Sequence, residues 1–239
     1  MFKRFVKKML NAWGLNIIQQ SKNPMYSLLG LRVFPIRTII DVGSNQGQFA
    51  KTVLDVFPEA FLYCFEPLTE PFNKLRLWAE QQRNRKIIAY NVALGDSEGE
   101  VEFFSHINHS PSSSFLKTTD ICENLYPFTQ TQSSTPVNVT TLDLWFESVS
   151  PPPPREILLK LDVQGFEDRV IRGGQETLRK AKACIVEVSL DRLYENQATF
   201  QNLSTCLYEL GYEYVGNLRQ SYADDGHVIF IDAIFKRTD

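Results

Sequence analysis

Residues 37–47 read RTIIDVGSNQG, an apolar run that ends at Asp41 and leads into a turn with two glycines. The apolar run predicts a buried strand, and residues 48–56 are predicted to form the helix that follows. Gly43 and Gly47 allow a tight turn and let a ligand approach the bare backbone. The segment therefore predicts an α/β fold with a ligand site after its first strand.

Strands and helices alternate along the rest of the chain. Further strands are expected at residues 60–65, 87–91, 99–104, 156–163, 183–188, 212–217 and 227–236. Further helices are expected at residues 71–82, 142–147, 167–180 and 200–210. This alternation predicts a mostly parallel sheet with helices on both faces.

Residues 105–136 interrupt the alternation, with 12 serines or threonines in 32 positions. We expect a long loop here, which is either flexible or the wall of a binding site. Phe115, Tyr126 and Phe128 lie among the hydroxyl side chains. Aromatic rings mixed with hydroxyls suit a sugar or another polyhydroxylated ligand.

The composition is that of a soluble globular protein. The chain has 239 residues, 43% of them hydrophobic, and a formal net charge of −3. These values fit one sizeable domain and exclude a disordered chain or a disulfide-dense scaffold. No apolar run reaches the roughly 18 residues that span a bilayer. The four cysteines are scattered, without a C-x-x-C pair, and are expected to be free thiols: Cys64, Cys122, Cys184 and Cys206.

Residues 1–36 are predicted to form a helical lead-in to a main domain at 37–239. Residues 1–40 contain seven lysines and arginines and no acidic residue, and apolar side chains recur at helical spacing over residues 2–13. Such an amphipathic helix either packs on the domain or makes peripheral membrane contact through residues 1–20. The segment has no secretory signal, so a cytoplasmic location is expected. The acidic remainder of the chain argues against nucleic-acid binding.

Polar residues stand at the carboxyl ends of all five core strands: Asp41, Glu66, Asn91, Asp162 and Glu187. Ligands of open α/β sheets bind at this edge. The dinucleotide fingerprint would need glycine where the chain has Asn45 and Gln48, and the asparagine would crowd a pyrophosphate. Glu66 follows Asp41 by 25 positions, a suitable distance for binding two ribose hydroxyls. The ligand predicted is an adenosine without pyrophosphate, which suggests S-adenosylmethionine and leaves an NAD-dependent oxidoreductase as a weaker alternative.

Several segments, taken together and in order, resemble the FkbM-type S-adenosylmethionine-dependent methyltransferases over about 200 residues. They lie at residues 38–47, 65–67, 91–96, 139–143, 160–167 and 186–188. The resemblance implies a class I methyltransferase fold, a Rossmann-like three-layer sandwich. Its seven-stranded, mostly parallel sheet would contain one antiparallel strand, supplied by residues 227–236. The chain has Gln164 where the family more often has glutamate, which puts in doubt an acid or base role there.

The resemblance also implies where the cofactor lies. Around its methionine part we expect Asp41, Gly43, Ser44, Asn45 and Gly47. Glu66, with Pro67 beside it, is expected to bind the ribose hydroxyls. Three residues are expected to flank the adenine: Asn91, Val92 and Ala93.

The expected reaction is O-methylation of a sugar, glycolipid or secondary metabolite. A hydroxyl acceptor must lose its proton as the new bond forms, which requires a general base. Asp162 is the first candidate, with Glu187 and His109 as others, and His106 is a weaker one. Lys160 and Asp162 lie on the same side of one strand, so a structural ion pair is the alternative role for Asp162. No metal is expected, since no typical ligand cluster is evident, and a non-catalytic nucleoside-binding or membrane-docking module remains an alternative function.

Overall fold

The computed structural model describes residues 28–83, 85–106 and 109–238, together with Val6, Met9, Leu10, Ala12 and Trp13. Most of the predicted lead-in helix therefore lies outside the described residues, and membrane contact through residues 1–20 stays a prediction. Met9 and Trp13 are 53% and 80% exposed, so these two side chains do not pack on the domain. Within the described residues, no helix combines the length and apolarity needed to cross a bilayer.

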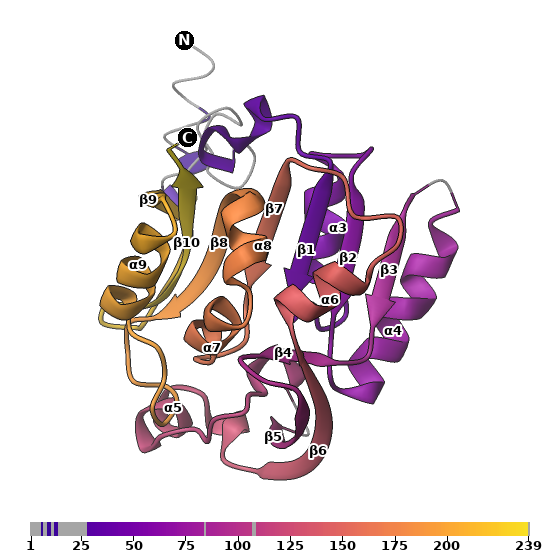
Figure 1. Ribbon diagram of the computed structural model, residues 1–239. Helices are drawn as coiled ribbons and strands as arrows, with labels where there is room; N and C mark the ends of the chain where they lie inside the picture. The colour runs from indigo at the N-terminus through magenta and orange to yellow at the C-terminus, as the bar shows by residue number, and fades with distance from the viewer. Residues whose placement is uncertain are drawn as a thin grey trace.

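The main sheet has seven strands in the order β3-β2-β1-β7-β8-β10-β9 (Figure 1). Their bounds are Thr38–Val42 for β1, Phe61–Phe65 for β2, Ile87–Tyr90 for β3, Ile157–Leu161 for β7, Ala181–Ser189 for β8, Tyr212–Tyr222 for β9 and Val228–Arg237 for β10. Strand β10 pairs antiparallel with both neighbours, and the other pairs are parallel. The predicted class I sheet with one antiparallel strand is confirmed.

Helices cover both faces of this sheet (Figure 1). On one face, Ile40 and Val42 of β1 share a core with α6 (Leu142–Ser148), α7 (Glu167–Arg172), α8 (Gln175–Lys180) and α9 (Phe200–Glu209). On the other face, Ile39 packs with η2 (Leu28–Val33), α3 (Gln48–Leu54) and α4 (Thr69–Gln81). Successive residues of β1 thus point to opposite faces, and both faces are dry because helices cover each one.

Two segments depart from the predicted outline. Leu28 and Leu31, assigned to the lead-in, are buried in the core, so the packed body begins before residue 37. The helix expected at 167–180 is two helices that part at Gly173 and Gly174. A Cβ on Gly173 would lie 1.9 Å from the carbonyl oxygen of Gly95, so the glycine lets the chain touch the neighbouring strand.

The loop expected at 105–136 is largely ordered structure, so that prediction was wrong. Strands β4 (Ala93–Gly95), β6 (Gln132–Thr141) and β5 (Gly99–His106) form a second sheet in that order. Between β5 and β6 lie η3 (Ser110–Ser112), α5 (Asp120–Leu125) and η4 (Pro127–Thr129). The first half of β6 is exposed and rich in serine and threonine, so its sequence lacks the apolar alternation of a half-buried strand.

The second sheet and α5 lie beyond the carboxyl ends of the main strands, at the bottom of the view (Figure 1). The cysteines are free thiols, as predicted: Cys64, Cys122 and Cys184 are buried and Cys206 is partly so.

Candidate active site

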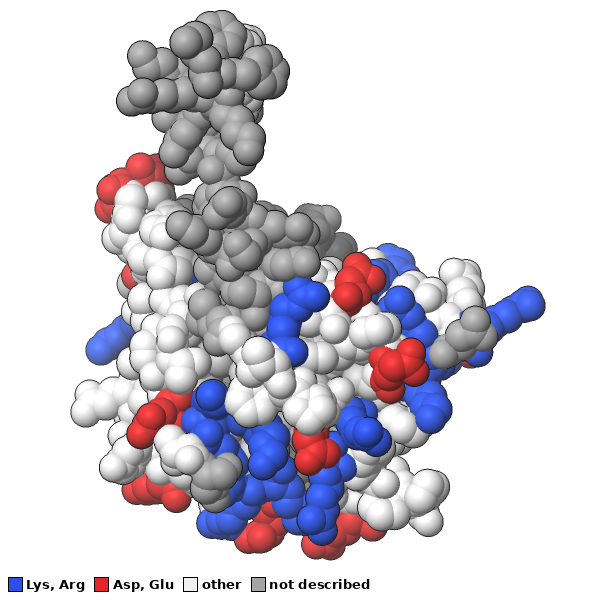
Figure 2. Space-filling model, turned by 90° about the horizontal axis from the view of Figure 1, so that it is seen from above, with Lys and Arg blue, Asp and Glu red and all other residues white. Residues whose placement is uncertain are grey.

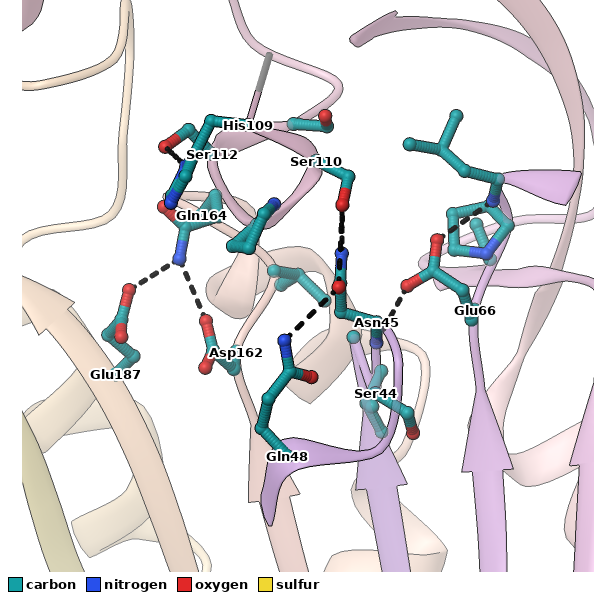
Figure 3. A pocket seen from close by; sticks show the side chains of 18 of the residues that line it. Ser44, Asn45, Gln48, Glu66, His109, Ser110, Ser112, Asp162, Gln164 and Glu187 are labelled. Carbon is teal, nitrogen blue, oxygen red and sulfur yellow. Dashed lines mark hydrogen bonds between the residues drawn. The ribbon is translucent and has the colours of Figure 1, made fainter. Parts of the chain in front are cut away.

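A cavity of about 460 Å³ lies between the carboxyl ends of the main strands and the segment that joins β5 to β6. Its volume is in the usual range for sites that hold a small organic ligand. The predicted site residues that line it are Asp41, Gly43, Ser44, Asn45, Glu66, Pro67, Val92, Ala93, His109, Asp162 and Glu187. Gly47 and Asn91 are not among the lining residues. Figure 3 shows the labelled side chains pointing into this space from several elements.

The turn after β1 is held in shape by its backbone. Gly43, Asn45 and Gly47 all have positive φ, at 80°, 46° and 82°. A Cβ on Gly43 would lie 1.9 Å from the carbonyl oxygen of Asp162, whereas a Cβ on Gly47 would meet Leu75 of α4. The absence of a side chain at Gly43 therefore lets the ends of β1 and β7 pack closely. Gly47 faces α4 rather than the cavity.

Glu66 at the end of β2 is held by two main-chain donors. Its Oε2 accepts from the Asn45 N–H at 2.9 Å, and its Oε1 accepts from the Leu68 N–H at 2.9 Å (Figure 3). Burial raises the pKa of this carboxyl to about 7. Each oxygen keeps a lone pair for a further donor, so the carboxylate is oriented to receive a pair of hydroxyls.

Asp41 lines the cavity with one carboxylate oxygen, Oδ2, that has no hydrogen-bond partner among the described residues. The residue is 1% exposed. Burial raises its pKa to about 7, against the attraction of Lys160. An unpartnered buried acceptor that lines a cavity is a place for a ligand donor.

Asn91 has a different environment from the one predicted for it. Its Nδ2 donates to the carbonyl oxygens of Glu66 and Pro67, both at 2.9 Å. The side chain thus braces the loop after β2, and it is the next two residues, Val92 and Ala93, that reach the cavity wall. A role beside the adenine stays open for those two alone, because the Asn91 amide is directed at the main chain.

The other end of the cavity is an acidic cluster on a row of paired strands. Glu187 of β8 stands opposite Asp232 of β10, which stands opposite Arg219 of β9. Lys160 Nζ donates to Asp162 Oδ2 at 3.2 Å and to Asp232 Oδ1 at 3.0 Å, so the predicted pairing with Asp162 is present. Arg219 Nε lies 3.0 Å from Asp232 Oδ2. Two cations thus face three carboxylates, which leaves the cluster one negative charge in excess when all five groups are ionised.

The turn after β7 carries Gln164 over this cluster. The Gln164 amide donates to Asp162 Oδ1 at 2.8 Å and to Glu187 Oε1 at 2.5 Å (Figure 3). Glu167 holds the turn, because its Oε1 accepts from the N–H groups of Val163 and Gly165. Burial raises the pKa of Glu167 to about 7 and raises that of Glu187 well above its usual range.

The two candidate histidines are in different surroundings. His109 lines the cavity beside Phe128, and its Nδ1 lies 2.8 Å from Ser112 Oγ. His106 is 3% exposed and is absent from the lining. Desolvation lowers the pKa of both rings, so they are neutral near pH 7.

The three aromatic residues expected in an acceptor wall, Phe115, Tyr126 and Phe128, all line the cavity. The sequence did not single out Arg219, Tyr194 or Phe230, which line it too. These three come from the C-terminal third of the chain. The strand pairing that brings Arg219 to the cavity leaves no local signal in the sequence.

The residues present fit S-adenosylmethionine. Glu66 can accept two ribose hydroxyls, the apolar Val92 and Ala93 can flank a base, and Asp41 Oδ2 can accept from the amino group. A metal is a different matter. Oxygens of Asp162, Glu187 and Asp232 lie within 4.8 Å of one another, but Lys160 and Arg219 already supply positive charge there.

The comparisons with known proteins identify the family of the chain. A family model described as the methyltransferase FkbM domain matches residues 41–214. The chain belongs to the FkbM methyltransferase family. The 2-O-methyltransferase NoeI of Sinorhizobium fredii (strain NBRC 101917 / NGR234) is 30% identical to this methyltransferase over 173 residues, which are 68% of each chain.

A crystal structure of methyltransferase FkbM from Methylobacillus flagellatus KT has the same fold, with a TM-score of 0.58 and 14% identity. The match covers 92% of this FkbM-family chain and 48% of that one, so the chain spans about half the length of the crystallised protein. The family match includes all the predicted site residues, from Asp41 to Glu187. Arg219 and Asp232 lie beyond it.

Proposed function

We propose that the chain transfers the methyl group of S-adenosylmethionine to a hydroxyl of an uncharged sugar. The family assignment supports methyl transfer and displaces the NAD-dependent oxidoreductase. The observation that carries the finer proposal is a cavity with two distinct ends. One end offers the backbone-held Glu66 and the unpartnered Asp41, and the other offers Asp162, Gln164 and Glu187 beside aromatic rings.

Glu66 and Asp41 would hold the cofactor. The bound sulfonium supplies an activated methyl carbon with a good leaving group, so the protein has to orient the acceptor, exclude water and take up a proton. Tyr126, Phe128 and Phe230 provide flat apolar surfaces of the kind that cover the C–H faces of a sugar ring. Ser110, Ser112 and Ser221 add hydroxyls that can bond to its rim.

Charge supports a neutral acceptor. Four carboxylates and one guanidinium line the cavity: Asp41, Glu66, Asp162, Glu187 and Arg219. Figure 2 shows the opposite end of the molecule, where many lysines and arginines gather among fewer acids. Where these carboxylates are ionised, the cavity attracts the cationic donor and repels a phosphorylated or carboxylated acceptor. The 2-O-methyltransferase activity in the name of NoeI supports oxygen as the atom methylated.

Calorimetry with S-adenosylmethionine and S-adenosylhomocysteine tests the donor site. We expect both to bind, and absence of heat with either at millimolar concentration would reject the donor. A panel of methyl glycosides, with S-adenosylhomocysteine production as the readout, tests the acceptor. Turnover with any member removes the non-catalytic alternative, and turnover with sugar phosphates alone would refute the neutral-acceptor proposal.

A further inference from the structure

The three candidate bases differ in how many partners they already have. Both oxygens of Asp162 accept hydrogen bonds, Oδ1 from Gln164 and Oδ2 from Lys160. The Lys160 ammonium is buried with it. Asp162 thus has a partner on each oxygen, and one of the two is the buried cation of an ion pair. Asp162 is therefore suited to the structural role that its pairing with Lys160 indicates.

Glu187 has one carboxylate oxygen, Oε2, that accepts no hydrogen bond from the described residues. Its Oε1 accepts from Gln164, while its Oε2 is ion-paired with Arg219 Nη2 at the longer distance of 3.7 Å. The residue lines the cavity although it is 7% exposed. Glu187 Oε2 can therefore accept a hydrogen bond from a ligand hydroxyl. The site has little access to water, and a carboxylate is a stronger base there than in water.

The Gln164 side-chain amide has its nitrogen, not its oxygen, directed at Glu187. Tyr194, itself 3% exposed, has a single hydroxyl proton and two acceptors, Gln164 Oε1 at 2.7 Å and the Ser112 carbonyl oxygen at 3.0 Å. The Gln164 amide nitrogen faces the carboxylates. Ser114 Oγ donates to the Gln164 carbonyl at 2.8 Å and fixes the backbone of the turn. A reversed amide would place its oxygen against two carboxylate oxygens, which is unfavourable.

We propose that Glu187 Oε2 takes the proton of the acceptor hydroxyl and that Gln164 is the positioning residue that aims Glu187 into the cavity. This rests on the proposed function. A lone pair of the acceptor oxygen forms a bond to the methyl carbon as the carbon–sulfur bond breaks. The electron pair of that bond stays on sulfur, and the hydroxyl proton passes to Glu187. The products are a methyl ether, neutral S-adenosylhomocysteine and a protonated Glu187.

Charged and titratable groups face Glu187 from every element around it. They are Lys160 of β7, Asp162 of the turn, Glu167 of α7, Tyr126, Tyr194, Arg219 of β9 and Asp232 of β10, and the uncharged Gln164 amide lies with them. Among them, Gln164 is the neutral donor that touches both Asp162 and Glu187. A glutamate at 164 would bring a third carboxylate into contact with those two and raise the pH at which Glu187 ionises.

The test compares four variants: Glu187→Gln, Gln164→Glu, Gln164→Met and, as the matched control on the exposed face of α9, Gln201→Glu. The probe is the first methyl glycoside that the wild type methylates, followed from pH 5 to pH 10. We expect Glu187→Gln to lose about 10²–10⁴-fold in kcat. Gln164→Glu should move the rising limb of the profile up by about one pH unit and recover at high pH, with KM little changed. Gln201→Glu should match the wild type.

A second readout needs no turnover. In ligand-free protein with ¹³C-labelled glutamate, the Glu187 carboxyl resonance is identified by its absence in Glu187→Gln. It should titrate above the ordinary glutamate range and move higher in Gln164→Glu. A Glu187 that titrates in the ordinary range, or that ignores residue 164, would overturn the proposal.

The remaining outcomes distinguish a failure of the Glu187 assignment from a failure of the proposed methyl transfer to a sugar hydroxyl. Wild-type rates in Glu187→Gln overturn the base assignment and leave the methyltransferase intact. A wild type that binds S-adenosylmethionine but methylates no glycoside refutes the acceptor class. Turnover lost to EDTA and restored by Mn²⁺ would also overturn the base assignment, because the carboxylates would then serve a metal.

Discussion

The two ends of the cavity are built in different ways. At the donor end, Glu66 is fixed by two N–H groups, that of Asn45 in the turn after β1 and that of Leu68 in its own loop. At the acid end, Glu187 is fixed by a side chain, Gln164, that another side chain orients. Main-chain donors cannot be mutated away, whereas a side-chain network can be retuned by one substitution. We therefore expect the donor end to resist change and the acid end to respond to it.

The largest effect is expected at Gly43, because its backbone packs against that of Asp162 and so links the two ends of the cavity. Gly43→Ala would place a methyl group 1.9 Å from the Asp162 carbonyl oxygen at a φ of 80°. We expect a loss of about 3–5 kcal/mol in the free energy of unfolding, measured in urea. Gly226→Ala is the matched control, since its φ is 91° and nothing lies within 4 Å. It should lose only about 1–2 kcal/mol, and equal losses would contradict the steric explanation.

The donor end itself is tested at Glu66. Glu66→Ala removes the acceptor of two N–H groups and of the expected ribose hydroxyls. Binding of S-adenosylhomocysteine should weaken by about 1–3 kcal/mol in calorimetry. Glu70→Ala, on the exposed first turn of α4, should bind as the wild type does. Unchanged affinity in Glu66→Ala would place the ribose elsewhere.

Asp41 is expected to make the stability of the protein depend on pH. Because the folded pKa of about 7 exceeds the ordinary 3.8, the folded chain holds this proton more tightly than the unfolded chain. Its contribution to the free energy of unfolding is complete below about pH 4 and is lost as pH rises to about 7. Asp41→Asn cannot ionise, so it should gain about 1–2 kcal/mol over the wild type between pH 5 and pH 8.

Urea unfolding at the two pH values measures this gain, with the exposed Asp224→Asn as the control. A difference between Asp41→Asn and the wild type that is the same at both pH values would mean that Asp41 keeps its ordinary pKa.

The smallest effect is expected at Asn91. Asn91→Ala removes two hydrogen bonds to the loop carbonyls and should cost about 1 kcal/mol of stability. Affinity for S-adenosylhomocysteine should fall less than in Glu66→Ala. A larger fall would show that Asn91 touches the adenine, as the sequence first suggested.

Local sequence patterns were enough to predict the main sheet and the meeting of Asp41 and Glu66 at one cavity. The turn from Asp41 to Gly47 and the acid at 66 each follow a buried strand, and strand ends in a parallel sheet meet at one edge. The direction of the Asn91 side chain was not predictable, because a strand terminus can point to the loop or to the cavity. The cluster of Glu187, Asp232 and Arg219 depends on the register of β8, β10 and β9. No segment of the sequence encodes that register by itself.

The wall over the cavity is an insertion between β5 and β6, and Asn45 Nδ2 to Ser110 Oγ, at 2.9 Å, is one bond that ties it to the donor turn. Such a tether is slight compared with the sheet beneath it. We therefore expect substitutions within residues 109–131 to change which acceptor is methylated more than they change the binding of S-adenosylhomocysteine. The fold thus combines a main sheet that carries Asp41 and Glu66 with a separate insertion between β5 and β6 that forms the cavity wall.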